Sequence, residues 1–376
     1  EPIQQLISLL KLRGSWGEVG NQVTGNDYPY IPGMAPYNAQ WIDPNTNLRY
    51  VSLGTPSLVS DNFTWETVQS FNLGIDLGLF NDKFNGSFDV FRRKTLDMLA
   101  PGSELPAVVG ASAPLQNVAD LETKGWDLEV NWEDNIKSFN YSLGLNLSDN
   151  RSFITRFKNE AGLLSDYYEG QEIGELWGYV THGFFTVDDF VEGSLNENLT
   201  GGTLKEGIAA FEGYEERQNP GDIRFVDLDG DGVITNGDNT LDNPGDRTII
   251  GNQGNRRYQF GINGSASYKN FDFSFYLQGV GKRDRWINTA LFWPYRSEFQ
   301  EIFANQLNYW TPENTDAYYP RYYPESSGNT DISRNLQTKY LLNGAYLRVK
   351  NITAGYSLPP SFLNSINITK ARIGTF

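Results

Sequence analysis

The carboxylates with the clearest chemical spacing lie in a short Asp- and Gly-rich segment, residues 227–238. Counted from Asp227, carboxylates stand at positions 1, 3, 5 and 12, and a glycine stands at position 6. EF-hand-type calcium loops have this spacing, because short oxygen ligands on alternate residues converge while the glycine turns the backbone. We expect one structural Ca²⁺, and the alternative is an acidic turn that binds nothing. The expected ligands are Asp227, Asp229, Asp231, the Val233 carbonyl, Thr235 (directly or through water) and Asp238.

A second group of residues is aromatic and falls in one long segment, 282–344. Flat rings offer stacking faces to sugars or peptides, and a guanidinium can contact a polar group of the same ligand. We expect these residues to contact substrate or partner, and the alternative is a loop packed on itself. The candidates are Trp293, Tyr295, Trp310, Tyr318, Tyr319, Arg321, Tyr322 and Tyr323.

The sequence offers little for catalysis. Cysteine is absent, which excludes a Cys nucleophile and thiolate metal sites, and the single histidine, His182, makes a Ser-His-Asp triad improbable. Carboxylates close in the sequence, such as Glu172 with Glu175 or Asp188 with Asp189, are the residue types of an acid/base pair. With 46 acidic residues, such pairs are expected by chance as solvated loop charge. We predict that the protein is not an enzyme.

Net charge and composition further restrict the possible classes of protein. The net charge is −16, which excludes a nucleic-acid partner because a phosphate-binding surface needs clustered Lys and Arg. Aromatic residues make up 14% of the chain, which is high for a soluble domain. No apolar run reaches the length of a membrane-spanning helix, but the strands of a membrane barrel alternate and need no such run.

Period-two alternation of apolar and polar residues dominates the chain and predicts a nearly all-β protein. Five segments alternate clearly: 71–79, 126–132, 139–147, 258–268 and 271–281. Four weaker candidates bring the expected strands to nine: 8–16, 84–93, 345–357 and 366–376. The apolar row of each clear strand is expected to face lipid, and the Asn, Ser, Asp and Gly row the lumen of a barrel.

Short and long connections alternate strictly between these strands, as in transmembrane β-barrels. The short ones lie near 81–82, 133–137, 269–270 and 358–365, and the long ones are 17–68, 94–123, 150–256 and 282–344. We therefore expect every long connection at one end of the strands. The alternative is a soluble, calcium-stabilised β-sandwich that binds carbohydrate.

The chain resembles the SusC/RagA-type TonB-dependent outer-membrane transporters. Five segments carry the resemblance: 10–22 (LKLRGSWGEVGNQ), 65–99, 117–128, 221–251 and 342–352 (LNGAYLRVKNI). They span nearly the whole chain in the order that the family has. Segment 221–251 contains the calcium-loop spacing, although the family does not by itself establish a metal site.

The resemblance implies the fold, the place in the cell and the partners. It implies part of a 22-stranded antiparallel transmembrane β-barrel with long extracellular loops. Residues 1–376 would be its C-terminal portion, without the plug, the N-terminal domains and the final strand. The implied function is uptake of glycans or peptides across the outer membrane of a gram-negative cell. The implied partners are a SusD-like surface lipoprotein, the TonB system through the missing N-terminal regions, and outer-membrane lipid.

Overall fold

One large antiparallel sheet dominates the computed structural model. The described residues are 6–21, 31–60, 63–102, 106–111, 113–294, 300–323, 328–364 and 368–375. Within them the nine-stranded sheet has the order β1-β4-β5-β6-β7-β14-β15-β18-β19. Its strands are β1 (Ile7–Asn21), β4 (Glu66–Leu79), β5 (Phe84–Pro101), β6 (Leu115–Ile136), β7 (Phe139–Arg156), β14 (Arg257–Tyr268), β15 (Phe271–Lys282), β18 (Tyr346–Ser357) and β19 (Arg372–Thr375).

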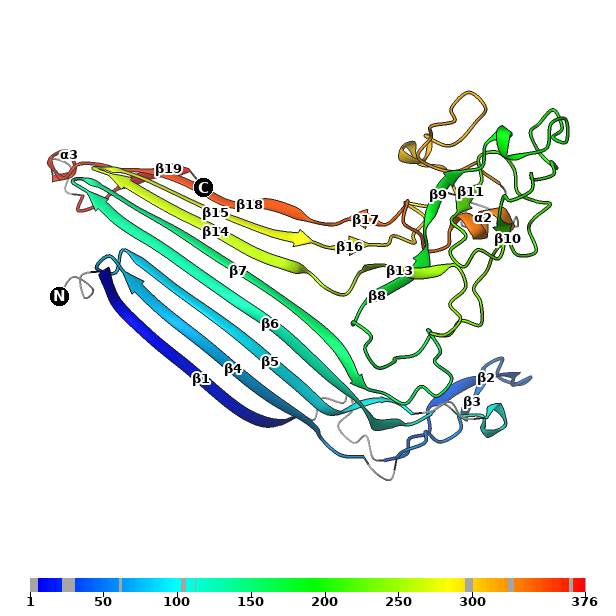
Figure 1. The fold of residues 1–376 in the computed structure, drawn as a ribbon. Coiled ribbons are helices and arrows are strands. Elements are labelled where there is room, and N and C mark those ends of the chain that lie inside the picture. Colours follow the sequence, from blue (N-terminus) through cyan, green and yellow to red (C-terminus); the bar gives the residue numbers. More distant parts are fainter. Residues whose placement is uncertain are drawn as a thin grey trace.

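Each of the nine expected strands is present, and every strand pairs with the next one of the sheet along the chain. This up-and-down order confirms the all-β prediction. Figure 1 shows the sheet as one curved layer, which excludes the sandwich alternative, since a sandwich needs a second sheet packed face to face.

The register places the apolar rows of neighbouring strands on one face. Directly opposed residues share a face of an antiparallel pair, and residues two apart along a strand share it too. Leu12 lies opposite Ile75, Ile75 opposite Phe88, and Phe88 opposite Leu128. We call this the outward face. Many of its side chains are exposed, including Leu12 at 76% and Leu347 at 63%, as expected of a surface that meets lipid.

The opposite, inward face is polar and carries its own ion pairs. Arg13 of β1 donates to both carboxylate oxygens of Asp76 and also to Asp89. Ser142 and Ser265 lie opposite each other on β7 and β14, with their hydroxyls 2.7 Å apart. The predicted assignment of polar rows to the lumen therefore agrees with the pairing.

The connections separate into two ends, as predicted. Figure 1 shows the short turns and α3 (Pro360–Asn364) at one end and the smaller elements at the other. The short turns are tight because their residues adopt left-handed backbone angles, with φ of 57° at Asn81, 57° at Lys137 and 52° at Lys269.

Five strands run further toward the long-connection end than the sequence pattern predicted, among them β1, which ends at Asn21 rather than 16. The expected connection 94–123 is mostly strand, because β5 continues to Pro101 and β6 begins at Leu115. β7 continues to Arg156, well beyond its expected end at 147, and β4 begins at Glu66 rather than 71. These extensions lie beyond the apolar rows that face lipid. Their sequences therefore need not alternate between apolar and polar residues.

The long connections fold into a body of their own, the loop assembly, formed by the described residues of 157–256 and 283–345. It holds paired short strands: β8 (Glu175–Tyr179) with β13 (Arg247–Asn252), β9 (Thr181–Phe184) with β11 (Ile223–Phe225), β10 (Ala210–Phe211) with β12 (Val233–Ile234), and β16 (Asp284–Arg285) with β17 (Leu342–Asn343). Its helices are α2 (Gly328–Ser333) and the 3₁₀ turns η2 (Val187–Asp189) and η3 (Ala304–Gln306). The connection between β1 and β4 carries β2 (Pro36–Ile42) and β3 (Arg49–Leu53), and that between β5 and β6 carries η1 (Ala107–Val109). None of the helices in the described residues is long and apolar enough to cross a membrane.

Candidate functional site

The centre of the loop assembly is an aromatic core that joins its two long connections. Tyr340 is fully buried there, and its ring centre lies 4.8 Å from that of Trp293 and 5.5 Å from that of Tyr318. The other core residues are Tyr179, Ile223, Phe225, Ile234, Tyr319 and Ile332. Four of these residues come from 157–256, namely Tyr179, Ile223, Phe225 and Ile234, and the rest come from 283–345. The core therefore holds the two connections together.

This core corrects part of the predicted aromatic site. Trp293 and Tyr319 are 2% exposed and Trp310 is 5% exposed, so their ring faces are covered by protein. At these three residues the alternative, a loop packed on itself, holds. Tyr295 lies outside the described residues.

The guanidinium of Arg321 is also occupied by contacts within the protein. Its guanidinium donates to the carbonyls of Leu199 at 2.9 Å and Asn198 at 2.8 Å, and lies over the rings of Trp310 and Tyr323. These contacts tie one long connection to the other. Arg321 therefore positions the loops, and its charge is partly screened from any ligand.

Tyr318 and Tyr322 are the aromatic candidates with accessible surface. Tyr318 is exposed, while its ring edge packs against Tyr340. Tyr322 is half-buried, stacks on Tyr309 with ring centres 4.5 Å apart, and donates its hydroxyl to the Gln306 carbonyl. Both rings are held rigidly by their neighbours while keeping a face or edge toward solvent.

Beside this core lies a buried carboxylate that sequence reasoning missed. Asp222 is 2% exposed, and its Oδ2 accepts from the Asn219 amide at 2.8 Å and the Asn329 side chain at 2.6 Å. Burial raises the pKa of Asp222 to about 7, while hydrogen bonds and the charge of Arg321 pull it down. Only the short motif Gly221-Asp222 hinted at a special position. A side chain at Gly221 would collide with Trp310, so this glycine allows the aromatic to lie on the backbone.

The predicted calcium loop brings two of its carboxylates together with a third that the spacing did not indicate. Oxygens of Asp227, Asp229 and Asp246 lie within 4.8 Å of one another. Asp231 and Asp238 are not members of this group. The Asp231 carboxylate accepts from the Val233 amide at 2.8 Å, and that of Asp238 accepts from the Asn243 side chain at 2.9 Å.

The donor chemistry of this group fits a hard cation. Asp227 accepts from the amides of Gly230 and Gly232, which fold the loop around its carboxylate. Asp246 is fully buried, and burial raises its pKa, as do the nearby charges of Asp229 and Asp227. All of these donors are oxygens, the ligands that Ca²⁺ takes. The Val233 carbonyl and Thr235 follow directly in the chain, and the Thr235 amide donates to Asp246 at 2.7 Å.

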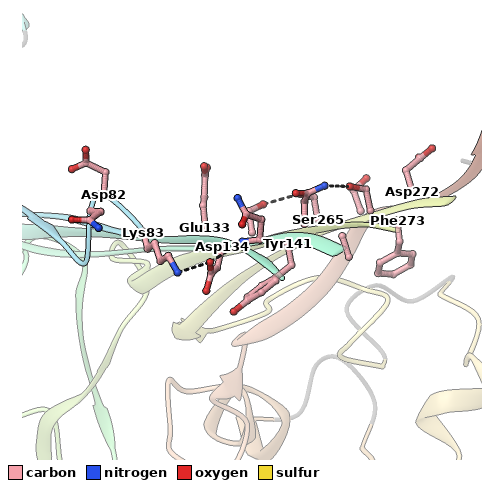
Figure 2. Close-up of a pocket in the computed structure, with 15 residues that line it drawn as sticks. Asp82, Lys83, Glu133, Asp134, Tyr141, Ser265, Asp272 and Phe273 are labelled. Carbon is pink, nitrogen blue, oxygen red and sulfur yellow. Dashed lines mark hydrogen bonds and ion pairs between the residues drawn. The ribbon is translucent and has the colours of Figure 1, made fainter. Parts of the chain in front are cut away.

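The inward face carries a polar recess near the short turns. Its volume is about 760 Å³, and its walls come from the turns after β4 and β6 and from β7, β14 and β15. Figure 2 shows Asp82, Glu133, Ser265 and Asp272 pointing to one side of the sheet and Tyr141 and Phe273 to the other. Side chains of carboxylates, hydroxyls and amides thus line the inner surface here.

Three of the four carboxylates considered for catalysis, Glu172, Glu175 and Asp189, are held in structural contacts. Glu172 pairs with Arg151 and accepts from Asn255, and Glu175 accepts from the Trp177 indole. Asp189 caps the turn at Thr186 and pairs with Arg224.

Comparison with known proteins gives a consistent result. Residues 3–175 match the family described as TonB dependent receptor-like, beta-barrel. TonB-dependent receptor P3 of Formosa agariphila is 29% identical across 98% of this chain and 34% of its own length. TonB-dependent receptor SusC of Bacteroides thetaiotaomicron is 26% identical across 94% of this chain and 32% of its own.

Solved structures agree on the fold. The RagAB peptide transporter superposes with a TM-score of 0.66 at 22% identity, over 98% of this chain and 37% of that chain. The chain spans about a third of the length of the curated relatives it matches. Together with the single curved sheet, its outward apolar face and the segregated loops, these matches assign the chain to the outer membrane. Over nearly its whole length the chain is similar to SusC/RagA-type TonB-dependent receptors, and its nine-stranded sheet has the fold of part of a barrel of that type.

Proposed function

We propose that the complete protein imports a nutrient across the outer membrane with energy from the TonB system. This chain supplies part of the barrel wall and the loop assembly outside it. The observation that carries the proposal is the two-faced sheet, apolar outward and polar inward, with every long connection at one end. TonB would act through regions of the protein outside this chain.

We propose an oligosaccharide or a peptide as the substrate. Both classes expose many hydrogen-bonding groups, and the inward face offers matching carboxylates, amides and hydroxyls. The name of one structural neighbour, the RagAB peptide transporter, supports the peptide class. Tyr318 and Tyr322 are the residues of the loop assembly that we propose for contact with substrate or partner, while Arg321 and Tyr323 join the two long connections that carry them.

A SusD-like surface lipoprotein is the proposed partner, seated on the loop assembly. A lid protein needs a rigid seat, and the buried aromatic core gives these loops the packing of a small domain. We also propose that Ca²⁺ at Asp227, Asp229 and Asp246 stiffens the same body. Asp231, Val233, Thr235 and Asp238 are proposed as further ligands once the ion draws the loop together.

Growth and uptake measurements test the import proposal. A strain lacking the whole receptor is grown on single oligosaccharides or peptides while uptake of the labelled compound is measured. We expect uptake of one class to be lost and restored by the wild-type gene. Tyr318→Ala should lower the restored uptake several-fold. Tyr167→Ala, which truncates an exposed tyrosine in the other long connection, 157–256, should not. Unchanged uptake of every compound in the deletion strain contradicts the proposal.

A further inference from the structure

A row of directly opposed residues crosses five strands on the outward face, at its long-connection end. It runs Trp16, Phe71, Arg92, Lys124, Arg151. Lys124 lies two residues before Trp126, the first aromatic of the apolar row of β6, and therefore on the same face. The last three members, Arg92, Lys124 and Arg151, form what we call the cationic ladder. They stand at the level of the aromatic residues that mark the lipid–water interface.

The charged side chains of the ladder are exposed, while the carboxylates that pair with them are largely buried. The side chains of Arg92, Lys124 and Arg151 are 52%, 59% and 47% exposed. Glu122 pairs with both Arg92 and Lys124 and is 6% exposed, and Glu172 pairs with Arg151 and is 14% exposed. The surface that meets the surroundings is therefore cationic.

The positive charge of the ladder is not fully neutralised by the carboxylates that pair with it. Like charges directly opposite each other on neighbouring strands destabilise a sheet. Here three such cations share two carboxylates, in a chain whose net charge is −16. A third negative charge from outside the protein would relieve the remaining repulsion.

We propose that the cationic ladder binds the phosphate-bearing headgroup of a lipid in the outer leaflet. The ladder is continuous with the lipid-facing apolar rows, so an acyl chain can lie along Leu128 and Val90 while the headgroup meets the cations. Two strand spacings make the ladder about 10 Å wide, the reach of one glycolipid headgroup. Clustered Lys and Arg beside a membrane-spanning surface are the usual basis of anionic-lipid recognition. The inference depends on which face meets lipid and is independent of what the receptor imports.

Lipid binding to the full-length purified receptor tests the proposal. Native mass spectrometry counts bound diphosphoryl lipid A, with dephosphorylated lipid A as the comparison. The ladder variant combines Arg92→Gln, Lys124→Gln and Arg151→Gln, and we expect it to bind diphosphoryl lipid A roughly tenfold more weakly. The control is Arg93→Gln, which removes one positive charge from the inward face beside Arg92 and should leave lipid binding unchanged.

A second variant controls for a folding defect, because the ladder variant leaves the buried carboxylate of Glu122 without its two cationic partners. Adding Glu122→Gln removes that charge, and heat-modifiable migration reports whether each variant is folded. Both folded variants should lose binding, and the wild type should prefer the diphosphoryl form roughly tenfold. If neither variant folds, the wild-type preference decides. Equal binding of the two lipids, wild-type binding by the folded variants, or displacement by equimolar inorganic phosphate each overturns the proposal.

Discussion

The barrel wall and the loop assembly use the same aromatic residues in opposite ways. In the wall, Trp16 is 67% exposed and Phe271 is 62% exposed, because lipid rather than protein covers the outward face. In the loop assembly, Trp293 and Tyr319 are 2% exposed and form a protein core. A wall residue is placed by strand register alone, whereas a loop aromatic is placed by contacts between distant segments.

This difference separates two sources of stability. The wall rests on continuous backbone ladders and on transfer of apolar side chains into the membrane. The loop assembly rests on a compact aromatic cluster and on buried polar contacts such as those of Asp222. Substitutions should therefore act mainly in the region that carries them.

The largest effect is expected from Tyr340→Ala in the loop assembly. Truncating a fully buried large aromatic costs about 3–5 kcal/mol, and Tyr340 is 0% exposed among several rings. Limited proteolysis should cut 283–345 much faster, while the barrel keeps its heat-modifiable migration. Loss of both properties together would show that the two regions do not fold separately.

A charge in the middle of the outward face should come next. Leu143→Arg should lower the free energy of unfolding in lipid vesicles by about 2–4 kcal/mol, because arginine must enter the bilayer. The matched control is Asn146→Arg on the inward face of the same strand, where the change should be mild. Equal losses at the two positions would point to a protein core behind the apolar row.

The pH dependence of the loop assembly should follow Asp222. Its pKa is raised by burial to about 7, so the folded state keeps a proton that the unfolded state has released. Stability of the loops is then greatest below about pH 4, falls by about 2 kcal/mol between about pH 5 and pH 7, and levels off above pH 7. Asp222→Asn should flatten this dependence of the proteolysis rate at 157–256. If the proteolysis rate of Asp222→Asn depends on pH as that of the wild type does, other titratable groups cause the dependence.

The smallest effect is expected at the calcium loop. Calorimetry on the purified receptor should give one Ca²⁺, and Asp246→Asn should weaken binding about tenfold by removing one carboxylate charge. The double variant Asp229→Ala with Asp231→Ala should abolish it, and Asp242→Asn, outside the group, should leave it unchanged. Wild-type calcium binding by the double variant would contradict the proposed site.

The wall was predictable from sequence because lipid imposes alternation on it. Segments such as 139–147 and 258–268 show both faces directly, and the nine strands follow in order. The extensions of β5 and β6 toward the long-connection end were missed because apolar and polar residues do not alternate cleanly there, and protein buries side chains such as Ala100, Ala119 and Glu122.

The candidate sites were predictable only where the signal is local. The spacing of Asp227 and Asp229 is visible within a few residues, but Asp246 lies far along the chain and joins them only through folding. Trp293 and Tyr319 look like binding residues in the sequence, because composition does not tell which ring faces are covered. The cationic ladder likewise appears only once register sets Arg92, Lys124 and Arg151 side by side.

Labelling of single introduced cysteines in whole cells tests the central claim, that this chain is a wall with its loops outside. The chain has no cysteine of its own. Ser138→Cys lies in a short turn and Asp242→Cys in the loop assembly, and both positions are exposed. A membrane-impermeant maleimide should label Asp242→Cys rapidly and Ser138→Cys only after the outer membrane is opened. Equal labelling of the two in intact cells would contradict the account.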